Sequence, residues 1–284
     1  MTTVNSLSGG KTSSYMAAHF PADVELFSLV RTTDQSCKFK DDAVRKIVED
    51  RLQTDFIGTL EDDTIIYTML DLEQYLGKPI TWITGPTFDS IVNKNRKDNG
   101  EYYKYLPNVT QRFCTVHMKV NPIFEWCRAN TDLPVEMRIG FRANETRRAS
   151  NMLKRCVDGI ESFRVIKSTN ERGRHKWHSI PYRTPRFPLI EQNILREQVH
   201  EYWKDKPVRF AYMNNCFGCF HRNPALLKLM SEMQANKFDW FANQETDTAR
   251  FIKGTSYNKI KESFKQVELF ESDFNECDSG FCGL

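Results

Sequence analysis

The sequence lacks long hydrophobic runs. No apolar stretch approaches the roughly 18 residues that a membrane-spanning helix needs. The first residues show no basic segment followed by an apolar run, so no secretory signal is evident. A large excess of charge of one sign is also missing, because the sequence has 40 Lys and Arg residues and 37 Asp and Glu residues, which gives a net charge of +3. These absences predict a soluble, cytoplasmic protein in which any basic binding site is local.

Internal repeats and low-complexity tracts are absent as well. Apolar residues make up 40% and aromatic residues 12% of the 284 residues, which is enough for a sizeable core. This length suits one large domain or a domain with an appendage. Eight cysteines are too few for a disulfide-stapled secreted scaffold of this size. They are therefore expected to be metal ligands, redox groups or buried apolar residues.

Short apolar segments alternate with amphipathic ones along much of the chain. This alternation predicts an α/β fold with a doubly wound, mostly parallel sheet in residues 1–190. Beyond Pro188 the composition favours helices, so residues 191–284 should form a small cysteine-bearing helical segment. Residues 93–107 are polar and should form a loop or an excursion over the binding site. The expected strands are 4–7, 24–30, 55–58, 79–84, 135–139 and 163–166, and the expected helices are 14–19, 38–51, 63–76, 190–203, 224–234 and 258–264, with one more from about 114 to 127 that Pro122 breaks or restarts.

A segment rich in glycine and hydroxyl groups follows the first expected strand. Glycine lets the backbone approach an anion closely, and the helix start that follows presents free N–H groups and the positive end of a dipole. The segment lacks the upstream glycine of the common GxxxxGK[ST] phosphate loop. We therefore expect a phosphate cradle of a different kind. Its expected ligand-binding residues are Ser8, Gly9, Gly10, Lys11, Thr12, Ser13 and Ser14.

Three further segments identify a family resemblance. They are RFCTVHMKVNP at 112–122, GFRANETRR at 140–148 and FPL at 187–189. Together with SGGKTS at 8–13, in this order, they resemble the PP-loop ATP pyrophosphatase superfamily. Within it they are similar to the phosphoadenosine phosphosulfate (PAPS) reductase branch, which includes the ATP pyrophosphatases of DNA phosphorothioation systems. The resemblance implies an adenine nucleotide alpha hydrolase-like fold.

The same resemblance implies an AMP-forming ATP pyrophosphatase that activates an acceptor for sulfur transfer, in nucleic-acid modification. ATP and Mg²⁺ would be its cofactors, and a sulfur-donor protein such as a cysteine desulfurase would be a partner. Lys119, Arg142 and Arg148 would neutralise charge at the α-phosphate. Glu145 would orient an arginine or bind magnesium through water. Asp34 follows the second expected strand and is a candidate for metal or ribose contact.

Thr12 leaves a second interpretation open. Many ATP-using members of the superfamily place Asp here, so the ligand could instead be a sulfated adenine nucleotide. The chain would then resemble a PAPS reductase, an oxidoreductase with Cys282 as nucleophile and thioredoxin as partner. Its last residues are similar to the ECGLH terminus of those enzymes, although Phe281 replaces the Glu and no His follows. A further alternative is a module that binds a nucleotide without turning it over.

Two cysteine pairs stand near the end of the chain. The first is a C-x-x-C knuckle in which Gly218 permits the tight turn that two thiolates on one ion require. Two pairs of cysteines predict a zinc ion or an iron–sulfur cluster. Cys127 and Cys156 are expected in the core. The expected metal ligands are Cys216, Cys219, Cys277 and Cys282, with Cys114 and His221 as alternatives.

A basic run with interleaved aromatic residues extends from Arg164 to Arg186. Positive charge combined with Trp177 and Tyr182 is typical of a nucleic-acid groove. The alternative is a solvated loop. If nucleic acid is a partner, we expect it to bind here. The basic residues of the run are Arg164, Lys167, Arg172, Arg174, His175, Lys176, His178, Arg183 and Arg186.

Overall fold

The computed structural model describes residues 1–95, 102–171 and 173–263. Its strands are β1 (Thr3–Leu7), β2 (Val24–Leu29), β3 (Thr81–Thr84), β4 (Asn93–Asn95), β5 (Tyr102–Lys104), β6 (Val135–Ile139), β7 (Cys156–Val157), β8 (Ile160–Thr169) and β9 (His175–Arg186). A seven-stranded sheet has the order β3-β2-β1-β6-β9-β8-β7, and β4 pairs with β5 separately. Strands β3, β2, β1, β6 and β9 run parallel, whereas β8 and β7 are antiparallel to their neighbours. The α/β fold with a mostly parallel sheet is confirmed.

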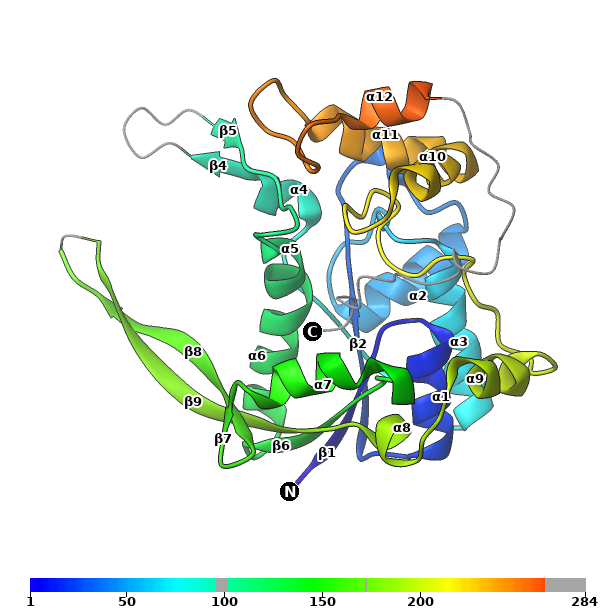
Figure 1. The fold of residues 1–284 in the computed structure, drawn as a ribbon, viewed down its shortest axis with the longest axis vertical. Coiled ribbons are helices and arrows are strands. Elements are labelled where there is room, and N and C mark those ends of the chain that lie inside the picture. Colours follow the sequence, from blue (N-terminus) through cyan, green and yellow to red (C-terminus); the bar gives the residue numbers. More distant parts are fainter. Residues whose placement is uncertain (96–101, 172, 264–284) are drawn as a thin grey trace.

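Helices cover both faces of this sheet, as Figure 1 shows for α1 to α3 on one side and α5 and α6 on the other. No helix among the described residues is both long and apolar enough to cross a membrane. The helices are α1 (Lys11–His19), α2 (Asp42–Leu52), α3 (Thr64–Leu76), α4 (Phe88–Val92), α5 (Phe113–Thr115), α6 (Asn121–Asn130), α7 (Thr146–Leu153), α8 (Pro188–Glu191), α9 (Arg196–Trp203), α10 (Pro224–Met233), α11 (Ala235–Gln244) and α12 (Tyr257–Glu262), with the turns η1 (Gln35–Cys37), η2 (Val116–Val120) and η3 (Ala143–Glu145).

The apolar strands bury side chains on both faces of the sheet. Val4 and Leu26 belong to the core on the side of α6, where Phe124 packs. Phe27 and Trp82 belong to the core on the side of α1 to α3, and their rings meet edge to face at 5.1 Å. Burial on both faces is what a run without polar alternation predicts for a central parallel strand.

Some expected elements are wrong. Residues 55–58 form no strand, and only an isolated bridge joins Thr32 to Gly58. Gly58 packs so closely that a Cβ there would lie 1.9 Å from the Cys37 carbonyl oxygen. The expected loop 93–107 contains the hairpin β4–β5, and the expected single helix 190–203 is interrupted after α8, where Asn193 has a left-handed φ of 53°.

Pro122 lies in the first turn of α6, as a fresh helix start would require. Proline has no N–H, so it cannot donate to the carbonyl four residues earlier. That carbonyl belongs to Met118, and it accepts a 2.9 Å hydrogen bond from Ser28 Oγ instead. The π-helical turn η2 precedes this point. Strand β2 thereby fixes the position of the helical run that carries Lys119.

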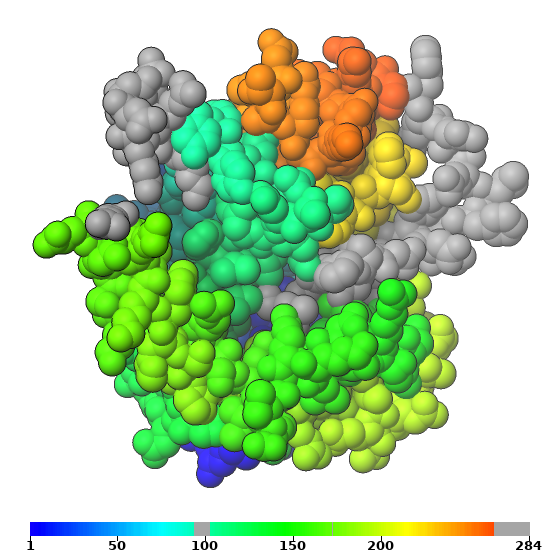
Figure 2. All heavy atoms as spheres, turned by 60° about the vertical axis from the view of Figure 1, so that its left-hand side comes forward, coloured from blue at the N-terminus to red at the C-terminus, as the bar shows by residue number. Residues whose placement is uncertain are grey.

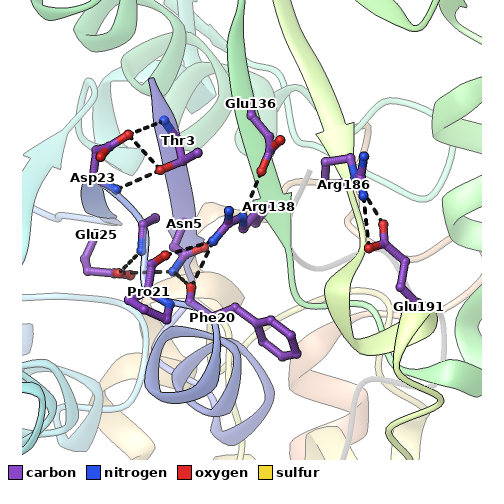
Figure 3. A network of polar contacts seen from close by, with 11 residues as sticks. Thr3, Asn5, Phe20, Pro21, Asp23, Glu25, Glu136, Arg138, Arg186 and Glu191 are labelled. Carbon is purple, nitrogen blue, oxygen red and sulfur yellow. Dashed lines mark hydrogen bonds and ion pairs between the residues drawn. The ribbon is translucent and has the colours of Figure 1, made fainter. Parts of the chain in front are cut away.

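A polar network closes the amino-terminal edge of the sheet (Figure 3). Asn5 Nδ2 donates to Glu25 Oε1 at 3.0 Å and to the Phe20 carbonyl at 2.9 Å. Arg138 Nη1 also donates to the Phe20 carbonyl, at 3.2 Å, so β6 and the end of α1 are joined there. Glu25 is only 1% exposed, and Lys78 Nζ lies 3.9 Å from its Oε1.

Replacing Glu25 with Gln should stabilise the fold above neutral pH. Burial raises the pKa of Glu25, although hydrogen bonds from Asn5 and Ala22 and the charge of Lys78 act in the opposite direction. The folded state therefore holds this proton more tightly than the unfolded state, and the stability that it contributes is lost as pH rises through the folded pKa. We expect the free energy of unfolding of Glu25→Gln to exceed that of the parent by about 1 kcal/mol at alkaline pH, and the difference to shrink in acid.

Urea denaturation at several pH values measures this effect. Glu125→Gln is the matched control, because the Glu125 side chain is 58% exposed. A constant difference between Glu25→Gln and the parent at all pH values would contradict the assignment of a buried charge to this carboxyl.

Candidate functional site

A cleft of about 570 Å³ opens at the carboxyl ends of β1 and β6. Strand β1 has β2 on one side and β6 on the other, so the order of the parallel strands reverses here. Such a switch point is where open α/β sheets bind ligands. Most of the site residues expected from the sequence line this cleft. They are Ser8, Gly10, Lys11, Thr12, Ser13, Lys119, Arg142, Glu145 and Arg148.

The expected phosphate loop, residues 8–13, is held by its own hydrogen bonds. Ser13 Oγ donates to the Gly10 carbonyl at 3.1 Å and accepts from the Ser8 N–H at 3.2 Å. Gly9 has a φ of +81°, and a Cβ on it would lie 2.4 Å from Ile65 Cγ2, so the turn requires glycine. Helix α1 begins directly afterwards at Lys11. The N–H groups of its first turn have no partners within the helix and are suited to an anion.

Three expected ligand-binding residues do not line the cleft. Gly9 packs against Ile65 behind the loop. Ser14 is fully buried in α1. The carboxylate of Asp34 caps η1 by accepting a 2.8 Å hydrogen bond from the Ser36 N–H.

The two arginines after β6 share one carboxylate. Arg142 Nε lies 3.0 Å from Glu145 Oε2, and Arg148 Nη1 lies 2.5 Å from Glu145 Oε1. Burial acts to raise the pKa of Glu145, but the charges of both arginines and a backbone hydrogen bond lower it overall. Arg148 also lies 4.1 Å above the ring of Phe141, which stacks on Phe187 at 5.4 Å. Glu145 therefore orients both guanidinium groups, one of the two roles expected for it.

Lys119 reaches the cleft from η2. Its Nζ lies 2.8 Å from Oε1 of the buried Glu61. Lys237 of α11 is 1% exposed and donates to the Glu61 carbonyl and to Asp63 Oδ1, both at 2.6 Å. Helix α11 thus holds the segment from Glu61 to Asp63, and Glu61 in turn holds Lys119.

A segment that the sequence did not point to forms another wall of the cleft. Trp203 Nε1 donates to the Lys11 carbonyl at 2.9 Å, across 192 positions of sequence. Asn214 packs against the phosphate loop, because a Cβ on Gly10 would lie 2.4 Å from its Nδ2. The contributing residues are His200, Trp203, Lys204, Lys206, Val208, Phe210, Ala211, Tyr212, Asn214 and Asn215.

The cleft is strongly electropositive. Burial, and then the charge of Arg196, lower the pKa of Lys11. The pKa of His200 is lowered by burial and by the charges of Lys11, Arg196 and Arg142. Glu145 is the one acidic residue that lines the cleft within the described part of the chain. Cations that depress one another's pKa are relieved by a bound anion, so the site is suited to a ligand with several negative charges.

A second, smaller cavity of about 60 Å³ adjoins the cleft, and Lys119 and Asn215 line both. Burial raises the pKa of the Cys216 and Cys114 thiols. Gly218 is required in the turn, since a Cβ there would lie 2.2 Å from the ring of Phe241. The candidate ligands that line this cavity are Cys114, Cys216, Cys219 and His221.

Thiols and an imidazole are the donors that zinc prefers, and thiolates hold iron–sulfur clusters. In residues 1–95, 102–171 and 173–263, however, no three His, Cys, Asp or Glu side chains are grouped as a complete metal site. Cys277 and Cys282 lie outside the described residues, so the described cysteines supply part of the expected ligand set. Cys127 is fully buried in the core as expected, whereas Cys156 is half-buried.

The basic run forms the long hairpin β8–β9, so its interpretation as a loop is wrong. Arg183 is buried and pairs with Glu161 at 2.8 Å, and Arg186 pairs with Glu191 at 3.1 Å. Arg172 lies outside the described residues. The other basic side chains of the run are exposed. The expected charge is therefore concentrated in the outer half of the hairpin.

Comparison of the chain with protein-family models, curated proteins and solved structures finds no match. The function must therefore be inferred from the cleft itself. Its phosphate loop, its cations and its position at the switch point are the features that a function must explain.

Proposed function

We propose that the protein is an AMP-forming ATP pyrophosphatase with an adenine nucleotide alpha hydrolase-like fold, which activates an acceptor for sulfur transfer in nucleic-acid modification. One observation carries this proposal. The phosphate loop before α1 and the cations Lys119, Arg142 and Arg148 line the same cleft at the switch point of the sheet. An anion on the loop would therefore have a second set of positive charges beside it, where the α-phosphate reacts.

The division of labour follows from the geometry. The N–H groups of the first turn of α1 would hold the released pyrophosphate, while Arg142 and Lys119 stabilise negative charge at the α-phosphate. Magnesium would supply additional charge to the phosphates when bound. Glu145 is already engaged by two arginines. The magnesium ion would therefore be held mainly by phosphate oxygens and water. Adenylation turns a poor oxygen leaving group into AMP, which a sulfur nucleophile supplied by a donor protein can displace.

Incubation with ATP and Mg²⁺, with and without nucleic acid, tests the proposal by separating the nucleotide products. We expect AMP and pyrophosphate. Release of ADP and phosphate would overturn the proposal. Sulfite release from PAPS with inert ATP would favour a PAPS reductase with Cys282 as nucleophile, and tight nucleotide binding with no product over hours would favour a binding module.

A further inference from the structure

The outer half of the β8–β9 hairpin takes no part in the cleft. It projects from the body of the protein in Figure 1 and forms the left edge of the face in Figure 2. Most described side chains between residues 162 and 179 are exposed. A two-stranded ribbon with so little burial is marginally stable in water. Exposure on this scale leaves the surface of the ribbon accessible to a partner.

One face of this hairpin carries an exposed aromatic ring among cations. Ile166 and Trp177 are directly paired across the strands, and Arg164 pairs with Ser179. The Arg164 guanidinium carbon lies 5.1 Å from the Trp177 ring centroid, and the ring of His175 meets Trp177 edge to face at 6.0 Å. Trp177 is 48% exposed, whereas the other four tryptophans are buried or half-buried. An aromatic side chain in this state presents a stacking surface to solvent.

The charge of the outer hairpin is strongly one-sided. Among the described residues from 162 to 179, Glu171 is the single acidic residue. Within the described part of the chain none of the basic residues of the outer half forms an ion pair, unlike Arg183 and Arg186 at the base of the hairpin. The lysines and arginines of the outer half that the structure describes are Arg164, Lys167, Arg174 and Lys176.

We propose that the outer β8–β9 hairpin binds an unpaired nucleic-acid strand. A base stacks on Trp177, and the guanidinium group of Arg164 and the neighbouring cations contact the backbone phosphates. Aromatic stacking beside positive charge is how proteins hold single strands without reading their sequence. A duplex keeps its bases stacked inside and cannot offer one to Trp177, so an unpaired strand is the better occupant. A lipid surface would need a wider apolar face than Trp177 and Ile166 provide.

Strand β9 connects the outer hairpin to the cleft. Tyr182 lies five positions after Trp177, about 17 Å along an extended strand, and its side chain is on the opposite face, with Phe163 and Ile180. Tyr182 and Arg183 both line the cleft. A nucleic-acid strand that crosses β9 from the Trp177 face can thus reach the proposed site of adenylation. Its identification as the acceptor rests on the proposed function, whereas its binding to the hairpin does not.

The test is fluorescence anisotropy with the full chain, without nucleotide, using a labelled single strand of about 20 nucleotides and its duplex. We expect Trp177→Ala to weaken single-strand binding about tenfold or more, as loss of one stacked base predicts. Stacking of a base should quench the fluorescence of Trp177. Trp177→Phe should lose this quenching and retain most of the affinity. Arg164→Ala should lower the slope of log affinity against log salt by about one. Lys46→Ala, which removes an exposed charge on α2, is the control and should change neither quantity.

Unchanged affinity in Trp177→Ala, or preference for the duplex, would overturn the inference. AMP formation from ATP is measured on the same variants and should be unchanged, because Trp177 does not line the cleft. If the parent binds the strand but forms no AMP, the proposed function fails and the strand-binding surface stands. If AMP forms and Trp177→Ala binds normally, the surface fails and the proposed function stands.

Discussion

We expect Arg142→Ala to lower the rate of AMP formation from ATP by about two to three orders of magnitude. Arg142 follows the carboxyl end of β6 and lines the cleft, and Glu145 holds its guanidinium group at 3.0 Å. A fixed cation aimed at developing charge costs no reorganisation during the reaction, which is why its removal is expensive. The fold should survive, because Arg148 still pairs with Glu145 and no buried carboxylate loses all its partners.

Arg147→Ala is the matched control for this prediction. Arg147 lies five positions after Arg142, in the first turn of α7, but its side chain is exposed and does not line the cleft. We expect its activity to stay within about twofold of the parent, as for an ordinary surface substitution. Arg142→Lys should recover only part of the rate, since lysine lacks the bidentate fork. Rates are measured as AMP and pyrophosphate at saturating ATP, with thermal melting as the check on folding.

The kinetic pattern also separates binding from catalysis. A raised KM with unchanged kcat would mean that Arg142 binds ATP equally in the ground and transition states. A fall in kcat is what stabilisation of the α-phosphate charge requires. Equal losses in Arg142→Ala and Arg147→Ala would contradict the role given to Arg142.

Sequence reasoning succeeded where a feature is local. The loop from Ser8 to Ser13 combines an apolar strand, two glycines and a helix start, and each has its own physical signature within a few residues. Arg142 and Arg148 could be placed together because both follow one strand in one motif. The parallel sheet followed from central strands without polar alternation, which are buried on both faces.

It failed where structure depends on distant contacts. Trp203 meets the Lys11 carbonyl across 192 positions, and no periodicity between residues 200 and 215 encodes that contact. The β8–β9 hairpin was read as a short strand and a basic run, because its outer half is exposed on both faces and so lacks the apolar alternation of a half-buried strand. The segment 55–58 resembles a strand in composition, but its close packing against η1 is a tertiary effect.

Replacing Cys216 and Cys219 together with Ser should remove nearly all metal from the purified protein. The turn between them is fixed by a 3.1 Å hydrogen bond from the Cys219 N–H to the Cys216 carbonyl, so both thiols start from one short segment. Serine hydroxyls are poor ligands for zinc and for iron–sulfur clusters, which require thiolates. Metal analysis and visible absorption of anaerobically purified protein measure the loss. A brown parent protein would indicate iron–sulfur chemistry, and a colourless one with zinc would indicate a structural clip.

Cys156→Ser is the control, because Cys156 lies on β7, does not line the cysteine cavity, and should leave the metal content unchanged. Full metal content in the double variant, or a parent protein without metal, would contradict the predicted site.

Cys114→Ser then distinguishes two ligand sets. Because Cys114 lines the same small cavity as the C-x-x-C pair, we expect its replacement to lower the metal content, since a tetrahedral site would then lack one of its four ligands. If Cys114→Ser retains its metal while Cys277→Ser and Cys282→Ser lose theirs, the two C-terminal cysteines complete the site. Lys119 lines both this cavity and the nucleotide cleft. Loss of metal should therefore also slow AMP formation, because the π-helical turn that carries Lys119 would lose the support of its neighbouring wall.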